Sequence, residues 1–428
     1  MAKIVVLGAG LGGMSAAYEI RSRVGTNHSI TMIGDGPLFN FTPSNPWVAV
    51  GWRSAEDIRV DVTRPLANHD IRFIPVAAEK VVPEAKRIDL VDGNSVDYDY
   101  LVITTGPRPA FEKVPGSGPE GFTQSICTGP HAQKAWHAYQ TFLTNPGPIV
   151  VGAMQGASCF GPAYEFAMIL DTDLRRRKLR DRVPMTFITC EPYIGHMGLG
   201  GIGDSEGLLE SELRRRHIKW IANSRVKKVE ADKVHLEELD HDGRVAHVHE
   251  LPFAFSMLIP GFAGVEAVQG VDGLVNPSGF IFIDEHQRNT KYPEIFAAGV
   301  CVAIPPVEST PVPTGVPKTG LMIESMVEAI AENLRAELAG KPARATATWN
   351  ALCLADMGDS GFAFLALPEI PPGNVTKTMA GKWVHPAKVA YEKYFLRKMR
   401  QGKADPGYEK RILKAFGIAR LKPKKHAA

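Results

Sequence analysis

KIVVLGAGLGG, residues 3–13, combines an apolar run with glycines at positions 8, 10, 12 and 13. The run predicts a buried strand, and residues 14–23 continue it as a helix. A second apolar strand follows at 29–33, so the segment has the layout of a βαβ unit. A G-x-G-x-x-G turn between a strand and a helix is typical of a dinucleotide-binding site, because its backbone approaches a pyrophosphate closely.

One position departs from this pattern. The acidic residue expected at the end of the second strand is replaced by Gly34. Asp35 stands one residue later, so we expect either this side chain or the backbone to contact the ribose.

Residues 148–165, PIVVGAMQGASCFGPAYE, repeat the strand–turn–helix layout with a different turn. A G-x-G-x-x-G pattern starting at Gly152 requires glycines where the chain has Met154 and Ala157. Since the second glycine lets the backbone approach a pyrophosphate, we expect Met154 to block NAD(P)H. The same turn holds Cys159. The second unit is therefore predicted to carry a thiol where a nicotinamide nucleotide would sit.

Strands expected at 98–106 and 294–299 flank this second unit. The pattern predicts an α/β fold with two interleaved Rossmann-like dinucleotide-binding domains and a C-terminal amphipathic-helix region. We place the first domain at 1–112 and 250–345, the second at 113–249 and the C-terminal region at 346–428. Within them we expect strands at 183–189 and 220–222, helices at 204–216 and 321–338, and an irregular Pro-rich loop at 305–320.

Composition excludes several classes of protein. The net charge of +3 gives no global field that would favour nucleic acid. The five cysteines form no C-x-x-C pair, so we predict no metal site of that type. No apolar run reaches the roughly 18 residues of a membrane span, and the first strand begins without a secretory signal, so no signal peptide is expected.

The C-terminal tail has a charge pattern of its own. Residues 382–428 hold fourteen Lys and Arg against three Asp and Glu. Apolar residues recur at helical spacing in 384–399 and 408–418, between basic residues. This pattern fits a helix in the interface of an anionic membrane. It fits equally a helix packed on the protein's own core with a solvated basic face, and the sequence leaves both open.

Together these segments resemble the sulfide:quinone oxidoreductases, membrane-associated flavoproteins related to type II NADH dehydrogenases and disulfide reductases. The resemblance extends nearly end to end and is strongest to the bacterial members with three functional cysteines. The motifs that carry it are GAGLGG, PSNPWVAVGW, YDYLVITTG, QSICT, GAMQGASCFGPAYE, EPYIGHMG, PPVESTPVPTGVPKTG and TWNALCLADMGD. It implies oxidation of sulfide to polysulfide through cysteine persulfides and FAD, with two electrons passing to membrane quinone.

The resemblance places the functional thiols on Cys127, Cys159 and Cys353. Sulfide oxidation needs a sulfur acceptor beside the flavin, and a cysteine in the turn that would otherwise hold NADH is placed for it. Whether FAD is covalently attached through Cys127 stays open. Cys190 and Cys301 match no role in the family, so we expect them to be buried packing residues.

The resemblance also implies a set of FAD contacts. They lie at Gly8, Ala9, Gly10, Gly12, Gly13, Gly34, Asp35, Ala78, Thr105, Gly106, Val300, Lys318, Gly320 and Lys388. Lys318 would place a positive charge beside the flavin ring, unless it is a solvated loop lysine. Val300 departs from the aspartate that many flavoproteins have there, so backbone or water must bind that part of the cofactor.

Further site residues are expected from their segments. Glu165, six residues after Cys159, would accept a proton from hydrogen sulfide or form a salt bridge with an arginine. His131 and His196 would relay protons, although lone histidines are more often structural. The walls of the quinone pocket are expected at Phe41, Leu354, Tyr391 and Tyr408.

Three other functions compete with this interpretation. They are a type II NADH:quinone oxidoreductase, the flavoprotein subunit of a flavocytochrome c sulfide dehydrogenase, and a non-catalytic membrane redox sensor. The expected partners are sulfide, membrane quinone and an anionic lipid surface, with no nucleic acid. A homo-oligomer stays open. We expect peripheral attachment to the bacterial inner membrane, on a face that the sequence does not identify.

Overall fold

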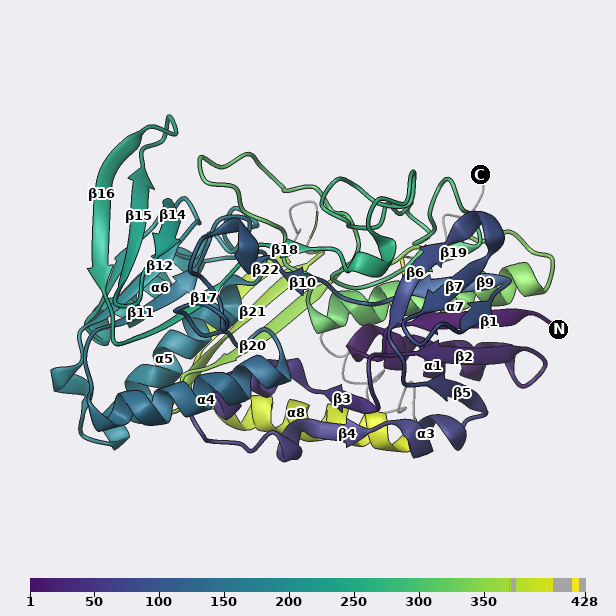
Figure 1. Cartoon of the computed structure of the whole chain (residues 1–428), viewed down its shortest axis with the longest axis horizontal. Helices are drawn as coiled ribbons and strands as arrows, with labels where there is room; N and C mark the ends of the chain where they lie inside the picture. The colour runs from purple at the N-terminus through teal and green to yellow at the C-terminus, as the bar shows by residue number, and fades with distance from the viewer. Residues whose placement is uncertain (369, 371–374, 403–417, 423–428) are drawn as a thin grey trace.

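The structure is a computed structural model of the chain, and it describes residues 1–368, 370, 375–402 and 418–422. Two parallel sheets lie toward opposite ends of the long axis, each with its own apolar core (Figure 1). A C-terminal sheet and helix lie along the region between them.

The first parallel sheet has five strands. In spatial order they are β19 (Ile295–Ala297), β9 (Tyr100–Ile103), β1 (Lys3–Leu7), β2 (Ser29–Ile33) and β5 (Ile71–Ile74). Helices α1 (Leu11–Val24) and α7 (Gly320–Leu338) pack against each other beside this sheet. Its strands are buried apolar runs, as both faces of a parallel sheet are covered. An antiparallel meander accompanies it, formed by β6 (Ala78–Val82), β7 (Arg87–Leu90) and β8 (Ser95–Asp97).

The second parallel sheet has four strands. In spatial order they are β13 (Ile218–Ile221), β12 (Met185–Thr189), β11 (Ile149–Ala153) and β17 (Phe255–Ile259). The helices of this part are α4 (Gly129–Thr144), α5 (Phe160–Arg176) and α6 (Ser205–Arg215). An antiparallel sheet stands out at this end of the molecule, with strands β14 (Ser224–Val229), β15 (Lys233–Leu239) and β16 (Val245–Pro252) (Figure 1).

The two parallel sheets are interleaved along the chain. Leu101 of β9 pairs with Ile295 of β19, although the whole second sheet lies between them in sequence. The predicted α/β class with two Rossmann-like units is therefore confirmed, whereas the residues at which the units meet stay a prediction. The helices expected at 204–216 and 321–338 are present within one residue of those limits, and 305–319 form no regular element.

The C-terminal part begins with an antiparallel sheet of β20 (Ala351–Asp356), β21 (Gly361–Leu367) and β22 (Val375–Ala380). Helix α8 (Val384–Gln401) follows. The smaller strands and helices are β3 (Leu38–Asn40), β4 (Arg59–Asp61), β10 (Arg108–Pro109), β18 (Phe262–Ala263), α2 (Asn45–Val48) and α3 (Thr63–Ala67). Short 3-10 turns are η1 (Thr42–Ser44), η2 (Glu56–Ile58), η3 (Pro83–Ala85), η4 (Phe111–Lys113), η5 (Arg180–Arg182) and η6 (Glu266–Val268).

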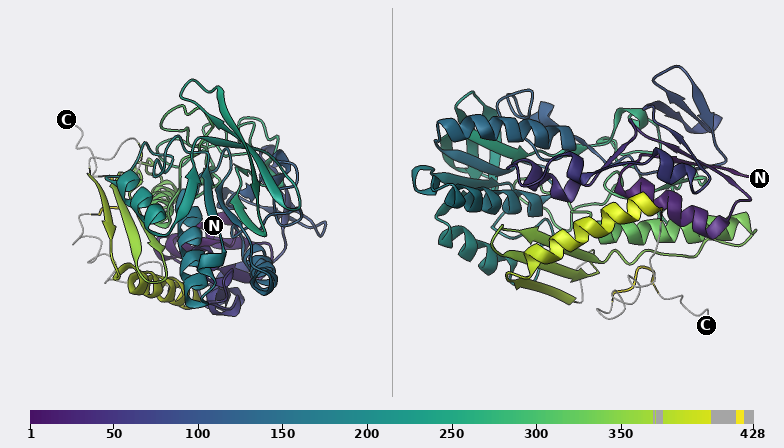
Figure 2. Two further views of the ribbon diagram at one scale, coloured as in Figure 1. Left: turned by 90° about the vertical axis from the view of Figure 1, so that its left-hand side faces the viewer. Right: turned by 90° about the horizontal axis from the view of Figure 1, so that it is seen from below.

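The structure of helix α8 contradicts one of the two interpretations of the C-terminal tail, namely that the apolar face of residues 384–399 lies in a membrane interface. The helix runs across the underside of the molecule (Figure 2, right) and packs its apolar residues Val384, Phe395 and Met399 into the protein. Lys388 and Lys398 are also buried, because each pairs with a buried glutamate. The apolar face of this stretch thus covers the protein's own core. The second amphipathic stretch, with Tyr408, lies outside the described residues apart from its last position.

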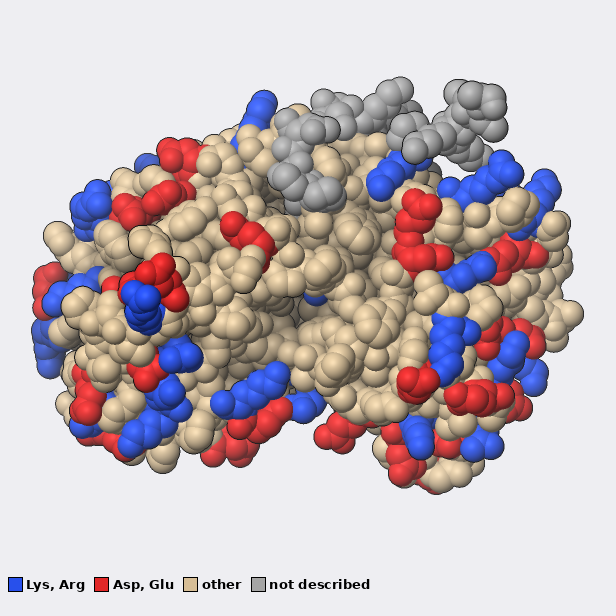
Figure 3. Space-filling model, turned by 90° about the horizontal axis from the view of Figure 1, so that it is seen from above, with Lys and Arg blue, Asp and Glu red and all other residues tan. Residues whose placement is uncertain are grey.

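The outer side of α8 keeps a basic character. Lys393, Arg397 and Arg400 are exposed, and Trp383 just before the helix is 47% exposed. Among the helices that the structure describes, none combines the length and hydropathy of a transmembrane span. Seen from above, charged side chains of both signs gather at the two ends of the molecule, whereas the middle of that face is mostly uncharged (Figure 3).

Candidate active site

The first glycine-rich turn joins β1 to α1 and is shaped for close backbone approach. Gly8 has a φ of +110°, and a Cβ atom on it would lie 2.6 Å from the carbonyl oxygen of Thr104. A Cβ atom on Gly13 would collide with the carbonyl oxygen of Gly8. At Gly10, by contrast, a Cβ atom would meet no heavy atom of the described chain within 4 Å. The turn is therefore closely packed at Gly8 and Gly13 and borders open space at Gly10.

The start of α1 offers backbone donors to this open space. Gly10 occupies the N-cap position, and within the described part of the chain no side chain caps the helix. Free N–H groups at a helix N-terminus bind phosphate well, because the helix dipole adds a partial positive charge. The turn thus fits the pyrophosphate of a dinucleotide.

The neighbouring residues fit the nucleoside. A Cβ atom on Gly34 would lie 2.7 Å from that of Ala9, so glycine is needed where β2 ends. Asp35 follows as an exposed side chain. Gly106, after β9, has a φ of +68° and also borders open space among the described residues. Thr105 beside it and Ala78 on β6 are half-buried.

The start of α7 forms the other border of this region. Thr319 caps the helix by accepting a hydrogen bond from the N–H of Met322 at 3.4 Å. Lys318 precedes it, with its Nζ atom 5.4 Å from the centroid of the Phe280 ring. Val300 lies at the end of β19, and buried Cys301 packs beneath it, where burial raises the pKa of its thiol to about 11.

In the second unit the turn after β11 is held by the Pro-rich loop. The N–H of Gly156 donates to the carbonyl of Pro313 at 2.7 Å, and the N–H of Gly315 donates to that of Ala157 at 2.8 Å. Met154, which we expect to block NAD(P)H, is 1% exposed and packs in a buried cluster with Val150; the block itself stays a prediction. Strand burial, alternating from face to face, turns this side chain inward.

Glu191 was missed by the sequence analysis. It stands just after β12, where the second strand of a dinucleotide-binding unit carries its ribose-binding acid. The carboxylate is fully buried and accepts hydrogen bonds from Tyr164 Oη, Thr189 Oγ1 and the N–H of Met197, each at 2.7 Å. Burial raises its pKa to about 7. The carboxylate that would bind a ribose in a dinucleotide-binding unit is therefore already hydrogen-bonded within the protein.

Two of the predicted cysteines lie near the start of α5. Cys159 is the N-cap residue of this helix. The Sγ atom of Cys353, on β20, lies 3.5 Å from the position of a Cβ atom on Gly161, two residues after Cys159. Both cysteines are half-buried and pack against the same apolar cluster. A helix N-terminus favours a thiolate over a thiol, so this location suits nucleophilic sulfur.

Cys127 lies against that cluster too, just before α4. Its N–H donates to Ser125 Oγ at 3.1 Å. Burial raises the pKa of its thiol to about 11, and the hydrogen bond to Ser125 lowers it by less. Burial thus favours the thiol over the thiolate at Cys127. Cys190 is buried at 0% exposure, which confirms the expected packing location.

Glu165 lies on the same face of α5 as Gly161, one helical turn further on. It forms a buried ion pair with Lys388 of α8, so its partner is a lysine where an arginine was expected. Its Oε1 atom also accepts a hydrogen bond from the N–H of Asp356 at 3.1 Å. Burial raises the pKa of Glu165 to about 7, Lys388 lowers it and the charge of Asp356 raises it. Lys388 contacts Glu165 and the Trp47 ring, at 5.0 Å from its centroid.

The two predicted histidines lie in different surroundings. His131 Nδ1 is 3.3 Å from Ser125 Oγ, close in sequence to Cys127, and burial lowers its pKa. His196 is 1% exposed, and its Nε2 atom lies 2.7 Å from Oε1 of Glu308 in the Pro-rich loop. His196 thus links two loops that pack around the Cys159 turn.

Two of the residues expected at the quinone pocket are in contact. The rings of Phe41 and Tyr391 are 5.8 Å apart. The Tyr391 hydroxyl lies 2.9 Å from the position of a Cβ atom on Gly320, at the start of α7. Leu354 is half-buried and faces away from Cys353, because neighbouring side chains on a strand point to opposite faces. Tyr408 lies outside the described residues.

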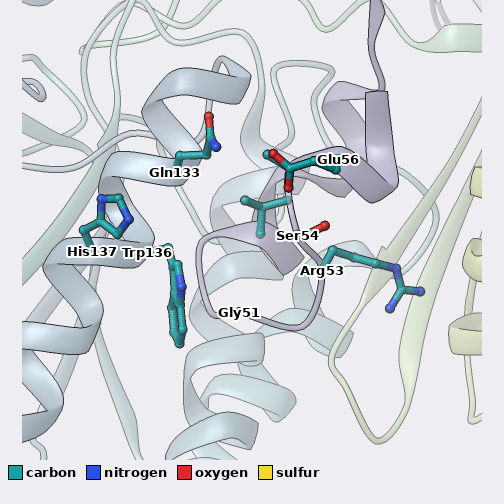
Figure 4. A pocket seen from close by; sticks show the side chains of 9 residues that line it. Gly51, Arg53, Ser54, Glu56, Gln133, Trp136 and His137 are labelled. Carbon is teal, nitrogen blue, oxygen red and sulfur yellow. The ribbon is translucent and has the colours of Figure 1, made fainter. Parts of the chain in front are cut away.

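A cavity of about 280 Å³ opens at the surface between α4 and the residues after α2 (Figure 4). Trp136 and His137 come from α4, and Ser54 and Glu56 face them from the loop. Arg53 points its guanidinium away from these residues, toward Glu392, at 3.1 Å. None of the predicted site residues lines this cavity.

The chain matches known proteins over most of its length. The family model of the pyridine nucleotide-disulphide oxidoreductases matches residues 2–331. The sulfide-quinone reductase of Aquifex aeolicus is 44% identical over 419 residues, which cover 97% of this chain and 95% of that protein.

Solved structures agree with the sequence match. The X-ray structure of the sulfide:quinone oxidoreductase from Aquifex aeolicus superimposes with a TM-score of 0.95, over 100% of this chain and 98% of that chain at 43% identity. NDH2 of Plasmodium falciparum, in complex with NADH, gives a TM-score of 0.71 over 98% and 100% at 15% identity, which shows the shared fold alone. This chain therefore belongs to the pyridine nucleotide-disulphide oxidoreductases and, within them, to the family of the sulfide-quinone reductases.

Proposed function

We propose that this protein is a sulfide:quinone oxidoreductase that builds polysulfide on its cysteines. The observation that carries the proposal is the approach of Cys353 to the start of the helix that Cys159 caps. The 44% identity to a sulfide-quinone reductase supports the donor and the acceptor.

FAD is the cofactor of the enzyme. When bound, it accepts two electrons from sulfur and passes them to quinone. The turn from Gly8 to Gly13 would hold its pyrophosphate, and Gly34 and Asp35 its adenosine ribose. Gly299, with a φ of +89°, and Val300 would border the chain that leads to the flavin ring. Lys318 would face the ring from the loop before α7.

We assign the sulfur chemistry to Cys159, Cys353 and Glu165. Hydrogen sulfide loses a proton, and the resulting hydrosulfide attacks a sulfur atom of a chain that bridges Cys159 and Cys353: one S–S bond forms, the bond to one cysteine breaks, and that cysteine leaves as a thiolate. When this thiolate closes the bridge again over the longer chain, a new S–S bond forms and two electrons are released, which FAD would accept. The Glu165 carboxylate, one helical turn from Gly161, where Cys353 packs, is the group that takes the proton of hydrogen sulfide. Each turnover removes two electrons from one sulfide, adds one sulfur atom to a cysteine-bound chain and reduces one quinone to quinol.

The other end of the reaction needs a lipid-soluble acceptor. We assign the quinone to the region of Tyr391, because its hydroxyl lies beside the start of α7 and its ring packs on Phe41. The exposed basic residues of α8 and Trp383 would meet an anionic membrane surface without crossing it. Persulfide chemistry, the quinone pocket and the membrane contact belong to the proposal.

NADH oxidation is the main competing function. The buried Glu191 speaks against it, because its carboxylate is held by three internal donors. The likeness to NDH2 at 15% identity supports only the fold.

The test uses the flavin-loaded protein without oxygen. Sulfide is expected to bleach the flavin absorbance within one turnover, and long-tailed quinone to restore it. NADH at micromolar concentration is expected to leave it unchanged. Rapid bleaching by NADH but not by sulfide would overturn the proposal.

A further inference from the structure

Asp356 is a fully buried carboxylate at the end of β20, the strand that carries Cys353. Its Oδ2 atom accepts a hydrogen bond from Trp47 Nε1 at 2.7 Å. Its Oδ1 atom accepts one from the N–H of Gly358 at 2.9 Å and lies 3.0 Å from Nδ1 of His385. A buried carboxylate with this many donors is held in one place, because each donor offsets part of its desolvation.

His385 forms the outer end of this arrangement. It lies in the first turn of α8, and 41% of its side chain is exposed. Its ring stands edge-on to Trp47, with centroids 6.1 Å apart. The imidazole is therefore in contact with solvent, whereas the Asp356 side chain that it meets is 0% exposed.

Glu165 forms the buried end of the arrangement around Asp356, of which His385 is the exposed end. The N–H of Asp356 donates to its carboxylate, and the charge of Asp356 acts on it through the buried interior. The charged groups that face Glu165 are Lys388 from α8 and Asp356 from β20. Cys353 of β20 lies beside Gly161, which precedes Glu165 by one turn of α5.

The charges of these groups are coupled. When His385 is protonated, its positive charge offsets that of Asp356, so less negative charge acts on Glu165 and its proton leaves more easily. When His385 is neutral, the full charge of Asp356 favours the protonated form of Glu165. The charge of Asp356 acts on Glu165 through the buried interior, where charges interact more strongly than in water, whereas solvent partly screens the charge of half-exposed His385.

We propose that Asp356 and His385 are positioning residues for Glu165, and that the charge on the exposed imidazole controls whether the buried carboxyl group holds its proton. The inference rests on the proposed function, since the proton concerned is the one that hydrogen sulfide gives up beside Cys353. It assigns both residues to the sulfide half-reaction, although neither touches sulfur.

The test compares two variants that act in opposite directions. The rate of flavin reduction by sulfide is measured across pH with the full chain loaded with FAD. In His385→Ala the uncompensated Asp356 charge is expected to move the acid limb to higher pH by about 0.5 to 1 unit. In Asp356→Asn the charge is absent, so the limb is expected to move to lower pH. Ionisation of sulfide itself is the same in all proteins and cancels in the comparison.

His137→Ala is the matched control, because this histidine is exposed on α4 and lines the surface cavity. Its pH profile is expected to coincide with that of the wild type. A residue with only a structural role would lower the rate at all pH values without moving the limb, so the opposite shifts identify the coupling.

A second readout does not depend on turnover. Infrared difference titration follows the carbonyl band of protonated Glu165, assigned as the band lost in Glu165→Gln. The same opposite shifts are expected there. If Asp356→Asn fails to fold, the shift in His385→Ala decides alone. Shifts below about 0.2 unit, or shifts in the same direction, would overturn the inference. If sulfide fails to reduce the wild-type flavin at any pH, the proposed function falls, and the infrared titration still decides the coupling.

Discussion

The Sγ atom of Cys353 lies 3.5 Å from the position that a Cβ atom on Gly161 would occupy. The two residues come from different parts of the chain, since Gly161 belongs to α5 of the second parallel unit and Cys353 to the C-terminal sheet. The missing side chain at Gly161 thus leaves room for the thiol beside the helix that Cys159 begins.

This contact predicts the effect of enlarging Gly161. In Gly161→Ala the new methyl group makes an ordinary contact with the sulfur, so sulfide-driven flavin reduction should stay near the wild-type rate. In Gly161→Val the larger side chain should displace Cys353 and lower the rate by about tenfold or more, as small misplacements of reacting groups do. Stopped-flow absorbance measures both. A wild-type rate in the valine variant, with an unchanged melting temperature, would contradict the assigned contact.

The cysteines should divide into two groups. Cys159→Ala and Cys353→Ala should each nearly abolish sulfide-dependent quinone reduction while FAD stays bound, because a sulfur chain must be handed between two thiols. Cys190→Ala and Cys301→Ala are the matched controls, since both thiols are buried in packing locations. They should keep the rate within about two- to threefold and lose about 1 kcal/mol of stability. Equal collapse in all four variants would show that the assignment of the chemistry is wrong.

Glu191 should make stability depend on pH. Burial raises its pKa from 4.5 to about 7, so the folded state keeps a proton that the unfolded state has lost between these values. The free energy of unfolding should therefore fall as pH rises through this window, by about 3 kcal/mol from this group, and stay level above it.

Glu191→Gln removes the titrating group and keeps a hydrogen-bonding side chain. Melting temperatures from pH 5 to pH 8 should show the difference: the variant should match or fall below the wild type at pH 5 and gain on it toward pH 8. A constant difference across this range would mean that Glu191 is charged throughout.

The outer face of α8 gives a prediction about the membrane. Lys393, Arg397 and Arg400 are exposed, and each basic residue near an anionic bilayer contributes about 1 kcal/mol at low salt. Replacing all three by glutamine should weaken binding to anionic liposomes by tenfold or more in flotation, and binding of the wild type should weaken as salt rises. Single-turnover reduction by sulfide should be unchanged, because the thiols lie elsewhere.

The control replaces Arg214, Arg215 and Lys219, which are exposed near α6, by glutamine. It removes the same charge from another surface and should bind as the wild type does. A truncation from Gly402 would be a poorer test, since Arg420 pairs with buried Glu324 of α7 at 2.9 Å. Equal loss of binding in both triple variants would mean that net charge alone, and no particular face, governs attachment.

Local sequence determined much of this protein. The apolar runs and the glycines at 8, 10 and 13 predicted the first βαβ unit, because strand burial and helix periodicity are encoded by neighbouring residues. The turn with Cys159 and the family resemblance identified the three cysteines. Cys190 and Cys301 were expected to be buried packing residues because they match no role in the family, and their burial is confirmed.

The tertiary structure decided which side chains of different elements contact each other. Sequence periodicity showed that α8 is amphipathic, but which partner covers its apolar face depends on residues far away: Glu165 and Glu324 bury two of its lysines. The sequence contains a local signal for Glu191, its position after β12. It contains no local signal for the contacts of Asp356 with Trp47 and His385. Such contacts join different elements of the chain, up to 309 positions apart in the pair of Trp47 and Asp356. Their energies depend on burial and distance, which the order of residues does not contain.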